Sequence, residues 1–242
     1  WYDGETGRLY VRLSGDRDPN TTRIEVPRFN QIVQIRGQDH IRISGLTFRF
    51  NNGAHWYDRW WDLPEVDGNA VSIVGESEDI TVSHCRFEHV RNAIWAQAPE
   101  NGRMDRIAVT DNDVRYSDYD AIVLRHGGAN DAPISQLYRV EVLRNRLSHV
   151  GQRPLRSEHG MAVTVGFPAV AHVAGNVLDR VWGAGLFIFG GKGSGQEGER
   201  ALSRILIHHN KVTHPLLNTN DWGGIETWQG GPHYVYNNIS GN

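Results

Sequence analysis

The sequence predicts an all-β chain that winds as one repeated coil, and three observations lead to this fold class. A β-branched segment with alternating apolar residues recurs, most copies carry asparagine at one fixed position, and a short apolar strand led by a small residue follows. The segment occurs seven times, at residues 41–48, 80–87, 107–114, 140–147, 171–178, 205–212 and 233–239. The first six copies start 27 to 39 residues apart, which favours a common coil with loops of variable length over unrelated hairpins.

Asparagine marks a bend at the sixth position of the repeated segment. Positions one, three and eight are apolar, which is strand alternation broken by one bend. Four asparagines occupy position six: Asn112, Asn145, Asn176 and Asn210. We expect them to stack with bonded side chains, because an amide supplies donor and acceptor and asparagine tolerates left-handed geometry. Turn preference explains any one of them but not four in one register, so the predicted fold is a right-handed parallel β-helix, a solenoid.

A second strand follows the bend in each coil, and its alternation predicts which side chains face outward. We expect an inward column of Val71, Ile94, Ile122, Met161, Leu186 and Ile225. The expected outward columns are Ser72, Trp95, Val123, Ala162, Phe187 and Glu226, and then Val74, Gln97, Arg125, Thr164, Phe189 and Trp228. We place the functional surface on these columns, because so repetitive a fold can carry chemistry only on its outer sheets or in adjacent loops.

The chain is expected to form one domain. Residues 1–38 predict an N-terminal hairpin and a lead-in strand, and residues 39–242 predict coils that continue beyond both ends of this partial chain. An insertion at residues 51–68 is rich in aromatic residues, which either stack on sugars or cover the end of the solenoid. These aromatics are Trp56, Tyr57, Trp60 and Trp61. The glycine-rich insertion at residues 190–200 is expected to be a mobile lip.

Composition excludes several classes of partner. Lys and Arg number 25 against 28 Asp and Glu, and without a basic stripe we expect no nucleic-acid partner. No apolar run approaches the length of a membrane span, so no membrane partner is expected either. The only cysteine, Cys85, replaces the asparagine of its repeat and is expected to be a buried small apolar residue. We expect a secreted or periplasmic protein whose export signal is not present in this chain.

The N-terminal motifs carry a resemblance to a known group of enzymes. Residues 1–10 read Trp-Tyr-Asp-x-x-Thr-Gly-x-Leu-Tyr, Pro27 follows, and residues 43–48 read Ile-Ser-Gly-Leu-Thr-Phe. This pattern resembles the region where the chain enters the coils in right-handed parallel β-helix glycoside hydrolases, including the β-xylosidase and α-fucosidase families. Residues 187–191 and 221–232 are similar to coil-closing motifs of such proteins. The resemblance covers nearly the whole chain and implies hydrolysis of a polysaccharide or its oligosaccharides without a cofactor.

Glycoside hydrolysis needs two carboxyl groups, about 5–5.5 Å apart for retention and about 6.5–9.5 Å apart for inversion. Equivalent positions on adjacent coils lie about 4.8 Å apart, so carboxylates on neighbouring coils suit a retaining pair. Asp120 and Glu158 precede strands of adjacent coils and are the first choice. Glu226 faces outward between Trp222 and Trp228, about three coils beyond Asp120, so only two of the three can act on one bond. The alternative interpretation of Asp120 is a turn residue. Glu158 can instead be a solvated loop charge, and Glu226 a solvated strand glutamate.

Substrate-binding candidates surround these carboxyl groups. Arg125 and His126 can anchor sugar hydroxyls or a carboxylate, although Arg125 can instead pair with Glu226 or Asp120. His159 adjoins Glu158, and Trp222 and Trp228 offer ring faces on which a sugar can stack. A carbohydrate is therefore the expected partner.

Two alternative functions stay open. Asp111, Asp113, Asp118 and Asp120 can gather oxygen ligands for calcium in a polysaccharide lyase, with Arg125 or Tyr119 as the base. A non-catalytic, tailspike-like coil would bind glycans through the same aromatic residues without a carboxylate pair. The twelve histidines are scattered and there is no cysteine pair, so we expect no zinc site and no metal in the hydrolase.

Overall fold

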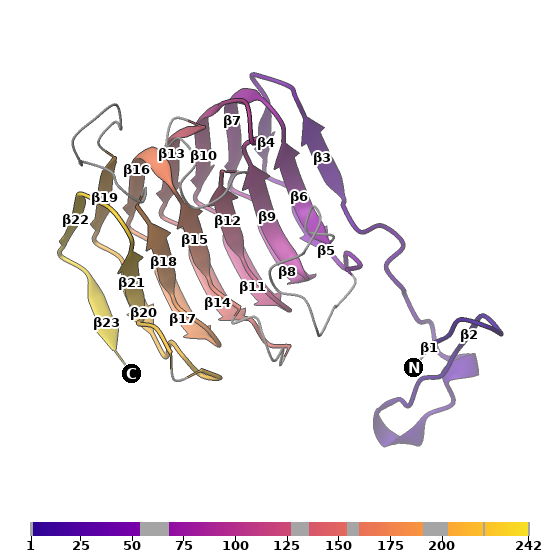
Figure 1. Cartoon of the computed structure of the whole chain (residues 1–242). Coiled ribbons are helices and arrows are strands. Elements are labelled where there is room, and N and C mark those ends of the chain that lie inside the picture. The colour runs from indigo at the N-terminus through magenta and orange to yellow at the C-terminus, as the bar shows by residue number, and fades with distance from the viewer. Residues whose placement is uncertain are drawn as a thin grey trace.

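The computed structural model describes residues 2–53, 68–126, 136–153, 160–190, 203–219 and 221–241. The N-terminal segment extends away from a stack of sheets (Figure 1). It contains an antiparallel pair, β1 (Tyr2–Asp3) and β2 (Arg8–Leu9), and two 3₁₀ helices, η1 (Ser14–Asp16) and η2 (Pro19–Thr21). A search of the described residues finds no helix with the length and apolar character of a membrane span.

The stack consists of three parallel sheets of seven strands each, and every coil contributes one strand to each sheet. Sheet I holds β3 (Val33–Arg36), β6 (Asn69–Val74), β9 (Asn92–Gln97), β12 (Ile122–Arg125), β15 (Val163–Gly166), β18 (Leu186–Phe189) and β21 (Ile225–Trp228). Sheet II holds β4 (Arg42–Ser44), β7 (Ser77–Ser83), β10 (Met104–Thr110), β13 (Leu137–Leu143), β16 (Pro168–Ala174), β19 (Arg204–His208) and β22 (His233–Tyr236). Sheet III holds β5 (Thr47–Arg49), β8 (Arg86–Val90), β11 (Asp113–Ser117), β14 (Arg146–Val150), β17 (Val177–Val181), β20 (Lys211–Thr213) and β23 (Ile239–Gly241). The arrangement is consistent with a parallel β-helix.

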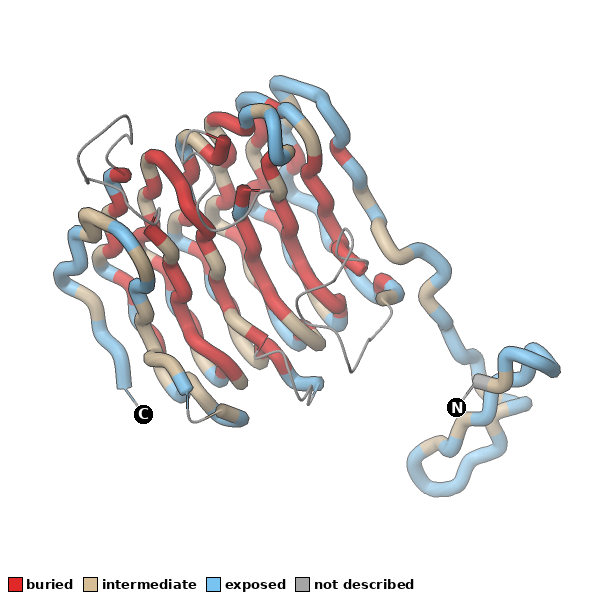
Figure 2. The backbone as a smooth tube through the Cα atoms, viewed as in Figure 1, coloured by how far each residue is buried: buried red, intermediate tan, exposed pale blue. Residues whose placement is uncertain are grey.

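One hydrophobic core runs along the stack between the three sheets (Figure 2). Positions one, three and eight of the repeat supply it, as predicted: Ile107, Val109 and Val114 of one coil are all buried in this core. At the N-terminal end the rings of Phe48 and Phe87 stack with centroids 4.9 Å apart. Burial of the same positions in successive coils makes the core continuous, as expected for a solenoid.

The predicted asparagine ladder is confirmed. Each side-chain Nδ2 donates to Oδ1 of the next asparagine, at 3.0 Å from Asn112 to Asn145, 3.0 Å from Asn145 to Asn176 and 2.9 Å from Asn176 to Asn210. Asn238 extends the ladder by a fifth member, accepting from Asn210 at 3.0 Å. Each ladder amide also donates to a backbone carbonyl of the preceding coil, so the buried corner is fully bonded.

The backbone bend lies one residue earlier than expected. The left-handed conformation belongs to the residue before each asparagine, with φ of 58° at Asp111, 54° at Arg144 and 54° at His209. The expectation that the asparagines themselves turn the chain is therefore wrong. The preceding residue reverses the backbone, and the asparagine then directs its amide into the buried corner. Cys85 heads this column and is buried with 2 % of its surface exposed, as predicted.

The coil that contains β15 is displaced by two residues from the predicted register. Ile122 pairs with Val163 and Arg125 pairs with Gly166, so Val163 faces the core where Met161 was expected. Thr164 and Gly166 therefore take the outward positions predicted for Ala162 and Thr164. A displacement of two preserves the alternation of a strand, so the apolar pattern alone does not distinguish the two registers.

Candidate functional site

The outer face of sheet I carries a continuous group of aromatic rings, which we call the aromatic strip: Phe167, Phe187, Phe189, Trp222 and Trp228. Phe189 lies at its centre, with ring centroids 5.3 Å from Phe167, 4.4 Å from Phe187 and 5.3 Å from Trp228. Phe187 contacts Trp222 at 5.3 Å. Trp228 is 49 % exposed, whereas Phe167 and Phe187 are buried, so the strip presents mainly the Trp228 ring to solvent. Aromatic residues with a few polar groups are typical of ligand sites.

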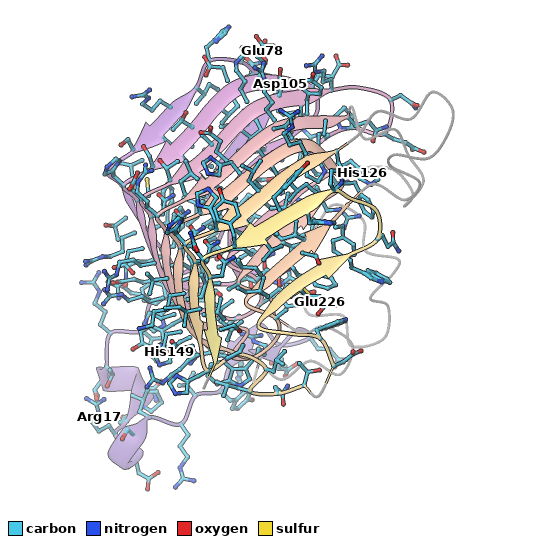
Figure 3. The ribbon with its side chains drawn as sticks, turned by 90° about the vertical axis from the view of Figure 1, so that its left-hand side faces the viewer. Arg17, Glu78, Asp105, His126, His149 and Glu226 are labelled. Atoms are coloured by element: carbon cyan, nitrogen blue, oxygen red, sulfur yellow. The ribbon has the colours of Figure 1, made fainter. Side chains whose placement is uncertain are left out.

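Glu226 lies at the C-terminal end of this strip. It pairs in register with Phe187, and its neighbour Ile225 packs against the core, so alternation directs Glu226 to the outer face as predicted. Glu226 and the buried His126 lie on one side of the stack, whereas His149 lies on the opposite side (Figure 3). The carboxyl Oε2 approaches Gly223, where an added Cβ would lie 3.1 Å from it. The side chain therefore lies near the turn that carries Asp221 and Trp222.

Arg125 sits on the same face, three coils from Trp228. Its guanidinium lies 5.8 Å from the ring centroid of Trp95, and its Nε donates to the carbonyl oxygen of His126 at 3.4 Å. It forms no ion pair with Glu226 or Asp120. The pairing considered from the sequence is therefore absent among the described contacts of Arg125.

His126 lies beneath the surface. It is 2 % exposed, and its ring meets the edge of Phe167 with centroids 4.5 Å apart. Burial lowers the pKa of His126 to about 4, the positive charge of Arg125 adds to this effect, and a hydrogen bond with Gln136 opposes it. The imidazole is therefore neutral at pH 7. In this position it supports the aromatic strip from below instead of presenting its ring to solvent.

Asp120 belongs to a second ladder at the corner before sheet I. Asn92 donates from Nδ2 to Oδ1 of Asn69 at 2.9 Å, and the Asp120 amide donates to Oδ1 of Asn92 at 3.0 Å. Oδ1 of Asp120 then accepts from the Met161 amide at 2.7 Å. Asp120 is 7 % exposed and lies three coils from Glu226, about 14 Å by strand spacing. This distance separates Asp120 and Glu226 too widely for one glycosidic bond.

Several predicted residues lie outside the described parts of the chain. Glu158 and His159 are among them, so the Asp120–Glu158 pair has no measured separation. The aromatics of the first insertion, Trp56, Tyr57, Trp60 and Trp61, and residues 191–200 of the expected lip lie outside them as well.

The aspartates considered for calcium are engaged in separate ion pairs. Asp111 accepts two hydrogen bonds from Arg144, both at 2.8 Å. Asp113 pairs with Arg115 at 2.7 Å, and Asp118 pairs with Arg153 at 2.6 Å. Within the described residues no three His, Cys, Asp or Glu side chains form a group that could hold a metal ion.

A second surface feature was not predicted from the sequence. Four rings stack along the outside of sheet III, with centroid separations of 5.8 Å from Phe50 to His89, 5.0 Å from His89 to Tyr116 and 4.9 Å from Tyr116 to His149. All four residues have positive φ. All four occupy the tenth position of the repeat, and this shared position is the signal from which the sequence could have predicted the column. A cleft of about 240 Å³ next to this column is lined by Phe50, His89 and Arg91 among others.

Comparisons of the chain with protein-family models, with curated proteins and with solved structures find no match. The arrangement of Glu226, Arg125 and the aromatic strip is therefore the basis for assigning a function.

Proposed function

We propose that the protein is a glycoside hydrolase whose three sheets close into a right-handed parallel β-helix and whose substrate lies along the outer face of sheet I. Parallel strands joined by crossovers within one sheet are right-handed in about 98 % of cases, which supports the handedness. The seven coils with a shared core support the solenoid.

The observation that carries the proposal is the position of Glu226 at the end of the aromatic strip. The exposed ring of Trp228 offers an apolar surface on which a sugar ring can stack, and the other rings of the strip pack around it. Glu226 forms no ion pair within the described residues, so its carboxyl group is available to a ligand. A carboxyl group beside a sugar platform can protonate the leaving oxygen of a glycosidic bond as general acid.

Asp221 is the described residue best placed to act as the second carboxylate. It lies two residues from Gly223, which Oε2 of Glu226 approaches, and two residues span at most about 7 Å of chain. Its Oδ1 accepts from the Trp222 amide at 2.9 Å, which fixes the side chain on the same turn. In this arrangement Asp221 acts as nucleophile or base opposite Glu226.

A glycan-binding protein without catalysis is the second candidate. Oδ1 of Asp120 accepts a backbone hydrogen bond, so one carboxylate of the predicted set contributes to the fold. The calcium lyase has less support, because Asp111, Asp113 and Asp118 each have an arginine partner.

Activity measurements separate these functions. We expect release of reducing ends or aryl groups from a panel of polysaccharides and aryl glycosides, without unsaturated products and without inhibition by chelator. Glu226→Gln should lower kcat about 10²- to 10⁴-fold, the range for loss of a general acid. The matched control is Glu141→Gln, an exposed glutamate on β13 of sheet II. Binding without turnover would support the glycan-binding candidate, and chelator-sensitive unsaturated products would support the lyase.

A further variant tests the second carboxylate. Asp221→Asn should lower kcat at least as strongly as Glu226→Gln while leaving the thermal midpoint unchanged, because Asp221 is exposed and its Oδ1 can still accept as an amide oxygen. Wild-type turnover in this variant would exclude Asp221 and return attention to Glu158.

A further inference from the structure

Among the described residues, Arg125 has no counter-charge on the face that carries the aromatic strip. Many arginines of the stack, such as Arg139 and Arg144, hold a carboxylate by two hydrogen bonds. Arg125 forms no ion pair with any described carboxylate. Its contacts are the Trp95 ring and the carbonyl oxygen of His126. The positive charge of this side chain is therefore not neutralised within the described structure.

Arg125 is exposed to solvent, and its guanidinium lies beside the Trp95 ring. Desolvation by the surrounding protein atoms lowers the pKa of Arg125. The buried ring of His126 beside it is neutral at pH 7 and supplies no compensating charge. A guanidinium that has already lost part of its hydration binds an anion more strongly than one in bulk water.

The outward column that contains Arg125 leads to the aromatic strip. In register it continues through Gly166 and Phe189 to Trp228. Gly166 has no side chain, and an added Cβ there would lie 3.2 Å from Cβ of Arg125. No side chain from Gly166 therefore separates the stem of Arg125 from Phe189.

We propose that Arg125 binds the carboxylate or sulfate of an acidic sugar unit, so that the ligands of the outer face are acidic oligosaccharides. The inference deepens the proposed function and rests on the same surface. Three strand spacings separate Arg125 from Trp228, about 14 Å. A glycan that follows the stack therefore places its acidic unit at Arg125 and a different unit beside Glu226. Arg125 contributes to affinity and selection, whereas Glu226 acts on the bond.

Binding measurements on the full chain test this assignment. The probes are a uronic-acid tetrasaccharide, the same tetrasaccharide with methyl-esterified carboxyl groups, and a sulfated tetrasaccharide. Hydrogen bonds to charged groups predict that the acid binds about 10- to 100-fold more tightly than its methyl ester. Preference for the uronate or for the sulfated probe identifies the anionic group.

Variants of Arg125 complete the test. Arg125→Met should remove the preference for the acid, and Arg125→Lys should restore part of it, because lysine keeps the charge but not the planar fork. The control is Arg204→Met, an exposed arginine on β19 of sheet II that makes no described ion pair. Thermal unfolding of each variant checks that the fold is retained.

The outcomes of the binding and activity experiments are distinguishable. Equal binding of the acid, its ester and the sulfated probe, no binding of any probe, or an anion preference that survives in a folded Arg125→Met variant would overturn the assignment of Arg125. Acid-selective binding that depends on Arg125 without any hydrolysis would support the assignment and contradict the hydrolase. Hydrolysis of neutral glycans through Glu226 without acid selectivity would support the hydrolase and contradict the assignment of Arg125.

Discussion

Asn145 donates from its side-chain Nδ2 to Oδ1 of Asn176 at 3.0 Å, and both side chains are fully buried. The Nδ2 of Asn145 also donates to the Val109 carbonyl at 2.9 Å. The backbone amide of Asn145 donates to Oδ1 of Asn176 at 2.9 Å. One side chain thus joins three successive coils. The corner is stabilised along the stack as well as within each coil.

Replacing Asn145 by alanine should strongly destabilise the protein. The change leaves the backbone amide of Asn112 and the Val109 carbonyl buried without their partners. Each unsatisfied buried group costs about 1–3 kcal/mol. We expect a loss of about 3–5 kcal/mol in the free energy of unfolding, measured by chemical denaturation. Asn218→Ala, at an exposed asparagine, is the control and should change it by less than about 0.5 kcal/mol. A loss below about 1 kcal/mol at Asn145 would show that the ladder contributes little.

Variants of Asp120 separate a structural from a catalytic role. Oδ1 of Asp120 accepts from the Met161 amide at 2.7 Å, and an asparagine oxygen can accept the same bond, as Asn92 does from Asp120. Asp120→Asn should therefore keep the hydrogen bond from Met161, and we expect turnover close to that of the wild type. Asp120→Ala should lower the free energy of unfolding by about 1–3 kcal/mol, because the Met161 amide loses its acceptor. A large loss of kcat in a stable Asp120→Asn variant would restore Asp120 as a catalytic residue.

The sequence predicted the features of the fold that depend on repetition. The column of Asn112, Asn145, Asn176 and Asn210 and the alternation of the strands could be predicted because each coil repeats the same physical requirement. The register of β15 could not be predicted, because a loop of changing length precedes this strand. A displacement by two residues keeps the alternation, so Val163 is as suitable for the core as Met161.

The site was less predictable than the fold. The outward orientation of Glu226 follows from alternation, whereas the burial of His126 depends on Phe167 and Gln136, which lie in the next turns of the chain. The ladder role of Asp120 had a signal in the sequence: Asn69, Asn92 and Asp120 each stand directly before an alanine at the start of the second repeated segment. Aspartate at a strand start suited both a turn and a catalytic residue, and the sequence did not reveal its hydrogen bond from the Met161 amide.

Stability should depend on pH through His126. The pKa of this buried imidazole is lowered from 6.5 to about 4 in the folded protein, so between these values the unfolded chain binds a proton that the folded protein does not. The free energy of unfolding should therefore fall as the pH drops from about 6.5 to about 4, by at most about 3 kcal/mol. Aspartates with lowered pKa, such as Asp105, lose their contribution only below 3.8, outside this window.

Denaturation at pH 7 and at pH 4.5 measures this effect. His126→Gln removes the titrating group and should flatten the pH dependence, although burial also lowers the pKa of His208 and His233, which retain a share of it. The control is His84→Gln, at an exposed histidine. An unchanged pH dependence in His126→Gln would show that the imidazole is not held neutral by the fold.

Cys85 offers a way to lengthen the ladder by one member. It occupies the sixth position of its repeat, its amide donates to Oδ1 of Asn112 at 2.9 Å, and its thiol approaches the Ile43 carbonyl at 3.9 Å. In Cys85→Asn the new Nδ2 would have Oδ1 of Asn112 and the Ile43 carbonyl as acceptors, by analogy with Asn112, which donates to Asn145 and Val82. Each added hydrogen bond contributes about 0.5–1.5 kcal/mol, so we expect the free energy of unfolding to rise by about 1 kcal/mol. Cys85→Ala, which removes the thiol without adding an amide, is the control and should not gain stability. A Cys85→Asn variant less stable than Cys85→Ala would mean that the first coils are packed too closely around position 85 for the ladder to continue there.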